Sequence, residues 1–286
     1  MTIHPILILL LLGHVLGDFY CQTGYVDREK KRKMTCLIIH GVIYWLCMVA
    51  VFGIGVELSW FWALLVIGAG ASHLAIDCIK KHSPVYIRKY TTIYIKERIP
   101  HCIKKHPMIK KEFMISQFLQ IVAFVIFWWL WGECVQVREH YILRGFLSML
   151  GYSSTNITLT ILGLLIVLKP VGIMIEKGDI WDFNKGKGKS APNEDQKGAG
   201  KMIGYLERTI VLFLLINNQF SAIAFVLAAK SVMRFPEIGK SNDGSSDKDS
   251  ADKGSSLAEF YLIGTLLSMT SVFIVAFMLG LIGLNT

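Results

Sequence analysis

The sequence lacks paired cysteines: its six cysteines are scattered along 286 residues, and no two of them form a CxxC motif. This spacing argues against a disulfide framework and is typical of isolated, reduced thiols. The amino-terminal segment lacks a basic region and a small-residue cleavage site, so we predict a retained helix rather than a signal peptide. The GKGKS stretch at 186–190 lacks the spacing of a phosphate-binding loop and no strand precedes it, so we interpret it as part of a flexible basic loop.

Apolar residues, by contrast, are abundant and are concentrated in long runs. The chain is 53% hydrophobic, with a mean hydropathy of +0.49, whereas soluble domains are usually about 45–50% apolar. Runs near twenty residues match the length of a membrane-spanning helix, and helices satisfy their own backbone hydrogen bonds in lipid. The sequence therefore predicts an all-α, polytopic membrane bundle of seven or eight hydrophobic segments. The expected segments are 3–19, 36–56, 58–78, 113–131 and 157–175, followed by a region at 202–233 and a last span at 260–283.

The region 202–233 has two interpretations, because Asn217, Asn218 and Gln219 interrupt its centre. It is either one tilted helix or a hairpin of two short helices that enters and leaves on the cytoplasmic side. A polar cluster that faces lipid is costly, which favours placing it at a turn. The choice determines on which side of the membrane the carboxyl terminus lies.

The chain is expected to have two parts. Residues 1–131 form a four-helix membrane domain that contains a group of His and Asp residues, and residues 132–286 form a second membrane region. Two stretches of the second region, 184–201 and 239–256, are rich in Ser, Asp, Gly and Lys and have no apolar period. We predict that both are flexible loops, because they cannot bury enough apolar surface to offset the entropy of ordering.

Basic residues indicate the orientation. Twenty-one Lys and Arg residues lie in 27–33, 79–112 and 176–201, against two in the intervening loops 55–59 and 132–156. Because cytoplasmic loops carry the excess of Lys and Arg, we expect these three segments to be cytoplasmic and the amino terminus to lie outside, in a bacterial cytoplasmic membrane. The net charge of +9 then has a membrane explanation, and nucleic acid is an unlikely partner.

The basic segment 79–112 also predicts contact with lipid headgroups. It mixes bases with Tyr and Ile, and each Lys or Arg near anionic lipid contributes about 1 kcal/mol. Membrane lipids are thus the expected partners. The candidate headgroup-binding residues are Lys80, Lys81, Arg88 and Lys89.

Polar residues that could carry chemistry gather at the cytoplasmic ends of the first three spans. His14 and Asp18 are spaced i, i+4, as are His73 and Asp77, so each pair shares one helical face. His40 lies about 8 Å inside the second span, at 1.5 Å per residue. Ionisable groups in a membrane are expensive and usually pair inside a bundle. We therefore expect all five side chains to converge, and imidazole and carboxylate together suit zinc, manganese or iron.

Such a metal, with open coordination positions, would activate water for hydrolysis of a lipid-linked or headgroup substrate. Five further residues are expected to support the ligands: Gln22, Tyr44, Lys80, Gln117 and Gln120. Two alternatives remain open. The polar cluster could be hydrogen-bonded helix packing in a non-enzymatic effector or partner-binding subunit, with a protein partner at its cytoplasmic face. It could also carry ions in a transporter or proton relay.

The same residues resemble a known family. The motifs that carry the resemblance are HVLGDFYCQ at 14–22, Lys30, His40 with Tyr44, SHLAID at 72–77 with Lys80, and FMISQFLQ at 113–120. Over about residues 5–125 they resemble the bacterial membrane proteins grouped as domain of unknown function 3307. That family has no settled activity, so the resemblance implies a relative and no mechanism. Its HxxxD-rich spans are also similar to those of membrane-bound metal-dependent hydrolases, which is a weaker analogy.

The fourth span departs from the family pattern. The pattern there is close to D-Q-x-x-H, whereas this chain has Ser116 and Gln120 at the Asp and His positions. If the Asp and His are ligands in the family, this chain lacks two of them. A site made by the first three spans would survive that loss.

Overall fold

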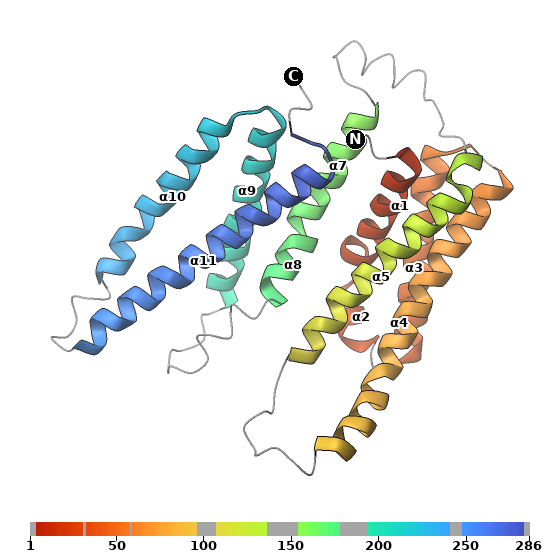
Figure 1. Ribbon diagram of the computed structural model, residues 1–286, viewed down its shortest axis with the longest axis horizontal. Helices are drawn as coiled ribbons and strands as arrows, with labels where there is room; N and C mark the ends of the chain where they lie inside the picture. The colour runs from red at the N-terminus through yellow and green to blue at the C-terminus, as the bar shows by residue number, and fades with distance from the viewer. Residues whose placement is uncertain are drawn as a thin grey trace. The chain divides into compact units, whose positions relative to one another are not determined.

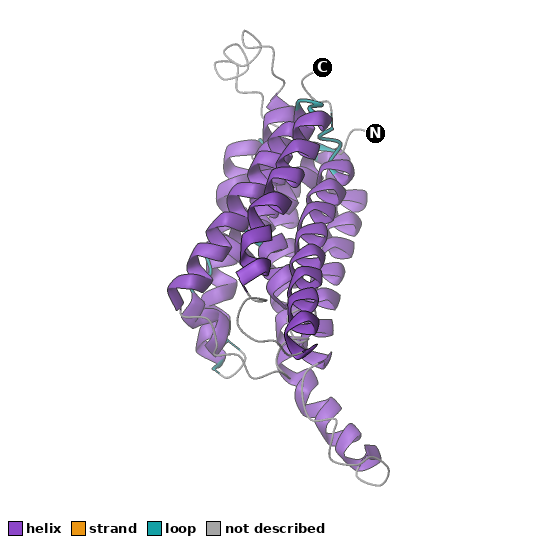
Figure 2. Cartoon of the chain, turned by 90° about the vertical axis from the view of Figure 1, so that its left-hand side faces the viewer, coloured by secondary structure: helices purple, strands orange, loops and turns teal. Residues whose placement is uncertain are grey.

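The computed structural model describes residues 4–30, 33–57, 59–95, 107–135, 154–177, 194–240 and 248–282. Within these ranges every regular element is a helix, which confirms the predicted all-α bundle (Figures 1 and 2). The chain divides into two compact units, Ile3–Ser148 and Met149–Thr286.

The amino-terminal unit is a bundle of antiparallel long helices with one short helix at its end (Figure 1). Its helices match the four predicted spans of this region. In chain order they are α1 (Pro5–Val15), the π-helical turn η1 (Leu16–Tyr20), α2 (Gly24–Glu29), α3 (Met34–Gly55), α4 (Trp60–Ile95), α5 (Pro107–Trp131) and the 3₁₀ turn η2 (Gly132–Cys134).

Two glycines bring α1 and η1 against α3. A Cβ on Gly13 would lie 2.5 Å from the Met48 sulfur, and a Cβ on Gly17 would lie 3.2 Å from the Tyr44 Cα atom. Small residues four apart let helix backbones approach closely, as in other membrane helix pairs. The approach holds the inner end of the first span, which carries His14 and Asp18, directly beside α3.

Helix α4 is longer than the sequence predicted. The predicted span ended at residue 78 and the predicted loop covered 79–112, but α4 runs for 36 residues to Ile95 and α5 begins at Pro107. At 1.5 Å per residue α4 is about 54 Å long, well beyond a bilayer core of about 30 Å. The loop prediction was wrong for 79–95 and 107–112, because extending an existing helix costs little once it has nucleated.

The core of the first unit includes a residue beyond Trp131. Val135, which follows η2, is 5% exposed and packs with residues such as Phe52 and Phe124. The compact unit that contains this core is Ile3–Ser148. The division after residue 131 stays a prediction.

The carboxyl-terminal unit is also helical (Figure 1). Its elements are α7 (Ser154–Leu168), α8 (Pro170–Lys177), α9 (Glu194–Ile216), α10 (Phe220–Lys240) and α11 (Lys248–Met278). Helices α9 and α10 form a hairpin whose turn is Asn217–Gln219, and Asn218 has a φ of 55°. The region 202–233 is therefore two helices joined at the polar cluster, and the single-helix interpretation was wrong.

The two predicted flexible stretches are partly helical. Residues 194–201 belong to α9 and residues 248–256 belong to α11, so a loop was the wrong prediction for these parts. Each polar segment extends a helix whose apolar portion packs in the unit. Residues 184–193 and 241–247 lie outside the described residues.

Four helices are long and apolar enough to cross a membrane, and they indicate a membrane protein. They are Met34–Gly55, Trp60–Lys80, Phe113–Trp131 and Thr155–Ile175, and only 17–33% of their most apolar windows is buried inside the protein. Helices that are apolar all round with so little burial fit a lipid environment. Shorter apolar helices occupy Pro5–Tyr20, Phe220–Lys230 and Ile263–Met278. The total of seven or eight spans remains a prediction.

Five of the six cysteines lie in the described residues, and none of these five forms a disulfide. This agrees with the reduced cysteines expected from the sequence. Cys102 lies outside the described residues.

Candidate functional site

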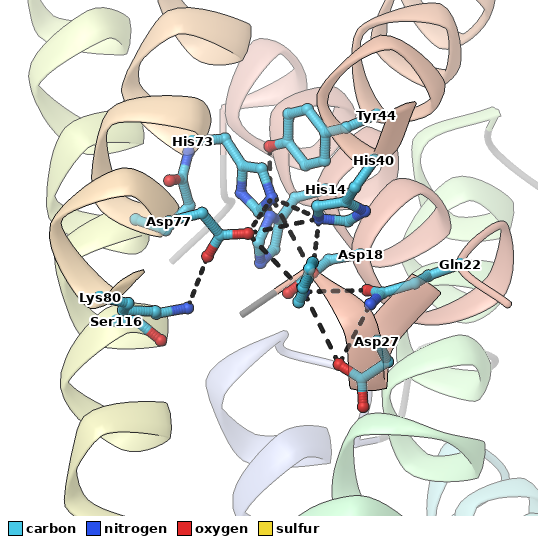
Figure 3. A network of polar contacts seen from close by, with 12 residues as sticks. His14, Asp18, Gln22, Asp27, His40, Tyr44, His73, Asp77, Lys80 and Ser116 are labelled. Atoms are coloured by element: carbon cyan, nitrogen blue, oxygen red, sulfur yellow. Dashed lines mark hydrogen bonds and ion pairs between the residues drawn. The ribbon is translucent and has the colours of Figure 1, made fainter. Parts of the chain in front are cut away.

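A buried polar cluster lies at one end of the amino-terminal bundle (Figure 3). Asp18 comes from η1, His40 from α3, and His73 and Asp77 from α4. The side chains of His40, His73 and Asp77 are 1%, 4% and 5% exposed, and Asp18 is 9% exposed. The expected convergence of these residues is present in the structure.

Four ligand-type atoms of this cluster face one another. His40 Nε2 lies 3.0 Å from His73 Nε2. His40 Nε2 also lies 3.4 Å from Asp18 Oδ1 and 3.5 Å from Asp77 Oδ2. His73 Nε2 lies 3.9 and 3.7 Å from the same two oxygens. We refer to Asp18, His40, His73 and Asp77 as the four-residue centre.

These separations match a coordination polyhedron. Ligands that bind a tetrahedral metal at 2.0–2.1 Å are separated from one another by about 3.3 Å. The five distances of 3.0–3.9 Å bracket that value. One ligand atom each from Asp18, His40 and His73 lie within 4.8 Å of one another, as a shared ion requires. The geometry and the N/O donor set both fit a divalent cation.

His14, the fifth predicted ligand, takes part differently. Its ring lies 5.7 Å from the His73 ring, so it belongs to the cluster, but both of its nitrogens bond elsewhere. His14 Nε2 lies 3.0 Å from Gln117 Oε1, and His14 Nδ1 lies 3.2 Å from Tyr44 Oη. Gln117 Nε2 in turn donates to Asp18 Oδ2 at 3.0 Å.

The donor and acceptor of each hydrogen bond in this series follow from the chemistry of the side chains. The Asp18 carboxylate only accepts, so the Gln117 amide donates to it and offers its oxygen to His14. His14 Nε2 must then carry a proton, which leaves Nδ1 to accept from the Tyr44 hydroxyl. Neutral His14 has no free lone pair in this arrangement. It is linked to Asp18 through Gln117.

A π-helical turn explains why His14 and Asp18 do not form a direct pair. Residues Leu16–Tyr20 are π-helical, and Cys21 N donates to Leu16 O at 2.8 Å. The wider turn changes the i, i+4 relation that an α-helix would give, and such turns are frequent at functional sites. By contrast, His73 and Asp77 lie on regular α4 and keep the expected i, i+4 contact at 3.7 Å.

Lys30 is the site residue that the sequence reasoning missed. Its Nζ lies 3.8 Å from Asp18 Oδ1 and 3.6 Å from Asp77 Oδ2, and the side chain is only 13% exposed. The residue was counted among the basic residues of 27–33 that indicate orientation. Helix α2, which is capped by the Thr23 side chain, turns the chain back so that Lys30 faces the centre. The sequence singled out this lysine only among the residues that carry the family resemblance, without a role at the site.

The predicted supporting residues differ in their contacts. Tyr44 stacks on the His73 ring at 3.8 Å, and Lys80 Nζ donates to Asp77 Oδ1 at 2.8 Å. Gln22 contacts the centre only through Lys30, whose Nζ donates to Gln22 Oε1 at 3.2 Å. Gln120 donates to Ser72 Oγ at 3.2 Å, and among the described residues it has no hydrogen bond to the four-residue centre.

Ser116, which stands at the family's Asp position, donates to the Phe113 carbonyl of its own helix at 2.7 Å. It therefore bonds within α5 rather than to the four-residue centre. Of the candidate headgroup-binding residues, Lys80 is engaged by Asp77. The side chains of Lys81, Arg88 and Lys89 lie outside the described part of the structure.

Two buried atoms of the centre have no hydrogen-bond partner among the described residues. They are Asp77 Oδ2 and His40 Nδ1. The Asp77 oxygen points at the two His Nε2 atoms and Lys30 without a hydrogen bond to any of them. A buried carboxylate oxygen without a hydrogen bond is costly and is available to a cation. His40 Nδ1 departs from the usual pattern, in which a ligating His donates its second nitrogen to a neighbour.

Comparison with known proteins identifies the first unit. No curated protein and no solved structure matches the chain. The model of the family described as "Protein of unknown function (DUF3307)" matches residues 6–144, which is nearly the whole of the unit Ile3–Ser148. The four-residue centre and its supporting residues all lie inside this match. Through residues 6–144, the chain belongs to this family.

Proposed function

We propose that this membrane protein binds one divalent metal ion through Asp18, His40, His73 and Asp77. The observation that carries the proposal is the convergence of two imidazole nitrogens and two carboxylate oxygens at 3.0–3.9 Å. Four electron-pair donors in a buried space favour a cation between them. Imidazole and carboxylate ligands suit zinc, manganese or iron.

The competing explanation is a charge network without metal. Lys30 and Lys80 already lie beside the two carboxylates, so the described charges balance when both His are neutral. The lysines differ in their geometry, however. Lys80 makes a 2.8 Å bond, whereas Lys30 stays 3.6–3.8 Å from both oxygens and bonds to Gln22 instead. The atoms that face the two imidazoles thus have no close cation of their own.

Metal analysis of the purified full chain by mass spectrometry tests the proposal. We expect about one metal per chain, with the metal lost in His40→Ala and in His73→Ala. Loss of a ligand should weaken binding by more than the 10–100-fold typical of supporting residues. His4→Ala is the matched control, because His4 caps α1 outside the centre. It should keep the metal.

The test separates the two explanations. If the cluster is only helix packing, the wild-type protein carries no metal after reconstitution with zinc, manganese or iron(II). His73→Ala then costs stability alone, of order 0.6 kcal/mol for a typical membrane hydrogen bond. That result would remove the metal proposal and leave a structural role.

A second candidate function is metal-dependent hydrolysis of a lipid-linked or headgroup ester. The observation that favours it is Asp77 Oδ2, which has no hydrogen bond among the described residues and lies 3.5 and 3.7 Å from the two His nitrogens. With Asp18, His40 and His73 as the three ligands, Asp77 would serve as the general base that takes a proton from the attacking water.

Asp77→Asn distinguishes a base from a fourth ligand. The amide cannot accept the proton, so the variant should retain the metal and lose release of water-soluble headgroup from phospholipid vesicles, measured by mass spectrometry. Loss of the metal itself would assign Asp77 as a ligand and count against this hydrolytic mechanism. A transporter or proton relay is a further alternative, and proteoliposome flux assays with the same variants would detect it.

We further propose that the chain lies in a bacterial cytoplasmic membrane with its amino terminus outside, in contact with lipids and with a protein partner at the cytoplasmic face. The bias of Lys and Arg toward 27–33, 79–112 and 176–201 supports this orientation. A single cysteine at Lys33, on a cysteine-free background, should resist an impermeant thiol reagent in intact cells. Rapid labelling from outside would show that this segment faces outward and would contradict the proposed orientation.

A further inference from the structure

Lys30 contacts the same two oxygen atoms that face the imidazoles of the four-residue centre. Its Nζ lies 3.8 Å from Asp18 Oδ1 and 3.6 Å from Asp77 Oδ2. Lys80 differs, because it donates to the other oxygen of Asp77, Oδ1, at 2.8 Å. A metal ion held by the centre would therefore leave the Lys80 bond in place, but it would use both of the oxygens that Lys30 contacts.

A third carboxylate, that of Asp27, also lies beside the Lys30 ammonium. Lys30 Nζ is 3.7 Å from Asp27 Oδ1 and donates to Gln22 Oε1 at 3.2 Å. Gln22 Nε2 donates to the same Asp27 oxygen at 3.1 Å. In Figure 3, Asp27 lies beyond Asp18 as seen from the two imidazoles. Asp27 is 56% exposed and Asp18 is 9% exposed, so the ammonium has both an exposed and a buried carboxylate within 4 Å.

The backbone that carries Lys30 is anchored, whereas its long side chain can change rotamer. Lys30 N donates to Val26 O at 2.8 Å, and Val26 of α2 is 8% exposed. The lysine stem is flexible and has four carbons. A shift of about 1 Å would bring the ammonium to a hydrogen-bond distance of about 2.8 Å from Asp27 Oδ1. The ammonium can thus reach the exposed carboxylate while α2 stays in place.

The charges around the centre favour such a shift when a metal ion binds. The ammonium groups of Lys30 and Lys80 lie beside the two carboxylates of the centre and offset their charge. A divalent ion would add two positive charges at about 2 Å from the ligand oxygens. Like charges repel strongly where water is excluded. Asp27 supplies a negative charge for an ammonium that leaves the centre.

We propose that Lys30 is a displaceable cation, which neutralises Asp18 and Asp77 in the metal-free protein and pairs with Asp27 when metal binds. This inference rests on the metal site proposed above. It gives Asp27 a part in metal binding without any contact to the metal. Each metal ion that enters the centre exchanges with an ammonium of the protein itself.

Zinc affinities of the full chain in detergent, from competition with a chelator, test the proposal. Asp27→Asn should weaken zinc binding by about threefold, the effect expected for one exposed ion pair. Glu29→Gln is the matched control, because it removes the same charge from the same helix and Glu29 pairs with Lys33 instead. It should leave the affinity unchanged.

The same substitution in a Lys30→Met protein tests the mechanism. Without an ammonium to displace, Asp27→Asn should no longer change the zinc affinity, because contacting residues act non-additively. If Asp27 only attracts zinc through its charge, Asp27→Asn weakens binding equally in both proteins. That result overturns the proposal.

Two further outcomes separate this inference from the metal site itself. If the wild-type protein binds no zinc, manganese or iron(II), the metal site is overturned and the displacement of Lys30 with it. If the wild-type protein binds metal and Asp27→Asn binds it as tightly as Glu29→Gln, the metal site stands and only the displacement is overturned. This comparison uses no Lys30 variant, so it decides the question even if Lys30→Met does not fold.

Discussion

The two units of this protein hold their buried polar groups in different arrangements. All eight His and all six Cys residues lie before residue 149, and the first unit joins three of the His to two Asp, two Lys, a Tyr and a Gln in one network. Among its described residues, the second unit has the separate ion pair of Glu207 with Lys230 and the buried cation Arg208. A shared network couples its members, whereas separate contacts contribute almost independently. The comparison therefore predicts larger and less additive effects of substitution in the first unit.

The largest effect is expected for Asp18→Ala. The Asp18 carboxylate contacts His40, Lys30 and Gln117, so its removal leaves several buried groups without a partner. Breaking a buried ion pair in this way costs about 3–5 kcal/mol of unfolding free energy. Lys230→Ala breaks a single, partly exposed pair in the second unit and should cost about 1 kcal/mol.

Reversible unfolding of the full chain in mixed micelles would measure both variants. Combining Asp18→Ala with His73→Ala should cost clearly less than the two single losses added together. Combining Asp18→Ala with Lys230→Ala should be additive. Equal costs for the two single variants would contradict the coupling that we assign to the first unit.

Glycine substitutions are expected to have the next largest effect. A Cβ on Gly17 would lie 2.8 Å from Tyr44 Cδ2 and 3.2 Å from its backbone Cα, and the backbone cannot move aside. We expect Gly17→Ala to lose about 1–3 kcal/mol through overpacking. Gly163→Ala in the second unit meets the end of the flexible Leu281 side chain and should lose less.

Two open glycines serve as controls for these variants. Gly53 in α3 and Gly264 in α11 have nothing within 4 Å of an added Cβ. Ala at either position should be neutral or stabilising by up to about 1 kcal/mol, because Ala is the better helix former. Thermal unfolding midpoints of the four variants would give the order of their stabilities. A Gly17→Ala protein as stable as wild type would show that α1 and α3 are not closely packed.

Lys30→Met tests whether the ammonium of Lys30 competes with a metal ion at the four-residue centre. If a metal binds there, the ammonium 3.6–3.8 Å from two ligand oxygens competes with it. Removing that charge should strengthen metal binding by about tenfold, which corresponds to 1.4 kcal/mol. Lys33→Met removes an exposed charge three residues away and should change the affinity little. Competition titrations with a chelator would measure both, and weaker binding in Lys30→Met would refute the competition.

The smallest effect is expected at the turn of the second unit. Asn218 has a φ of 55°, a conformation that Gly and Asn adopt at low cost. Asn218→Gly should therefore change stability by less than about 0.5 kcal/mol, whereas Asn218→Val should lose about 1–2 kcal/mol. The same thermal assay checks both, and a large loss in Asn218→Gly would mean that the side chain itself holds the hairpin.

Much of the fold could be predicted from local sequence. Apolar runs predicted the helices of both units, and the polar residues 217–219 favoured a hairpin turn over the alternative of one tilted helix. The errors occurred where polar chain continues a helix, at 79–95 and 248–256. Composition alone does not locate such ends, because each added residue of an established helix costs little free energy.

The sequence by itself predicted a helical membrane protein, because apolar runs of this length fit membrane-spanning helices. It also predicted that His14, Asp18, His40, His73 and Asp77 converge, because each HxxxD pair shares one helical face and the basic loops place these helix ends on one side of the membrane. Only the tertiary structure decided that His14 bonds to Tyr44 and Gln117, that Lys30 faces the centre, and that Arg208 has no carboxylate partner among the described residues. The first two outcomes depend on a π-helical turn and on the return of α2. Each of these redirects a side chain through long-range packing, which no local pattern encodes.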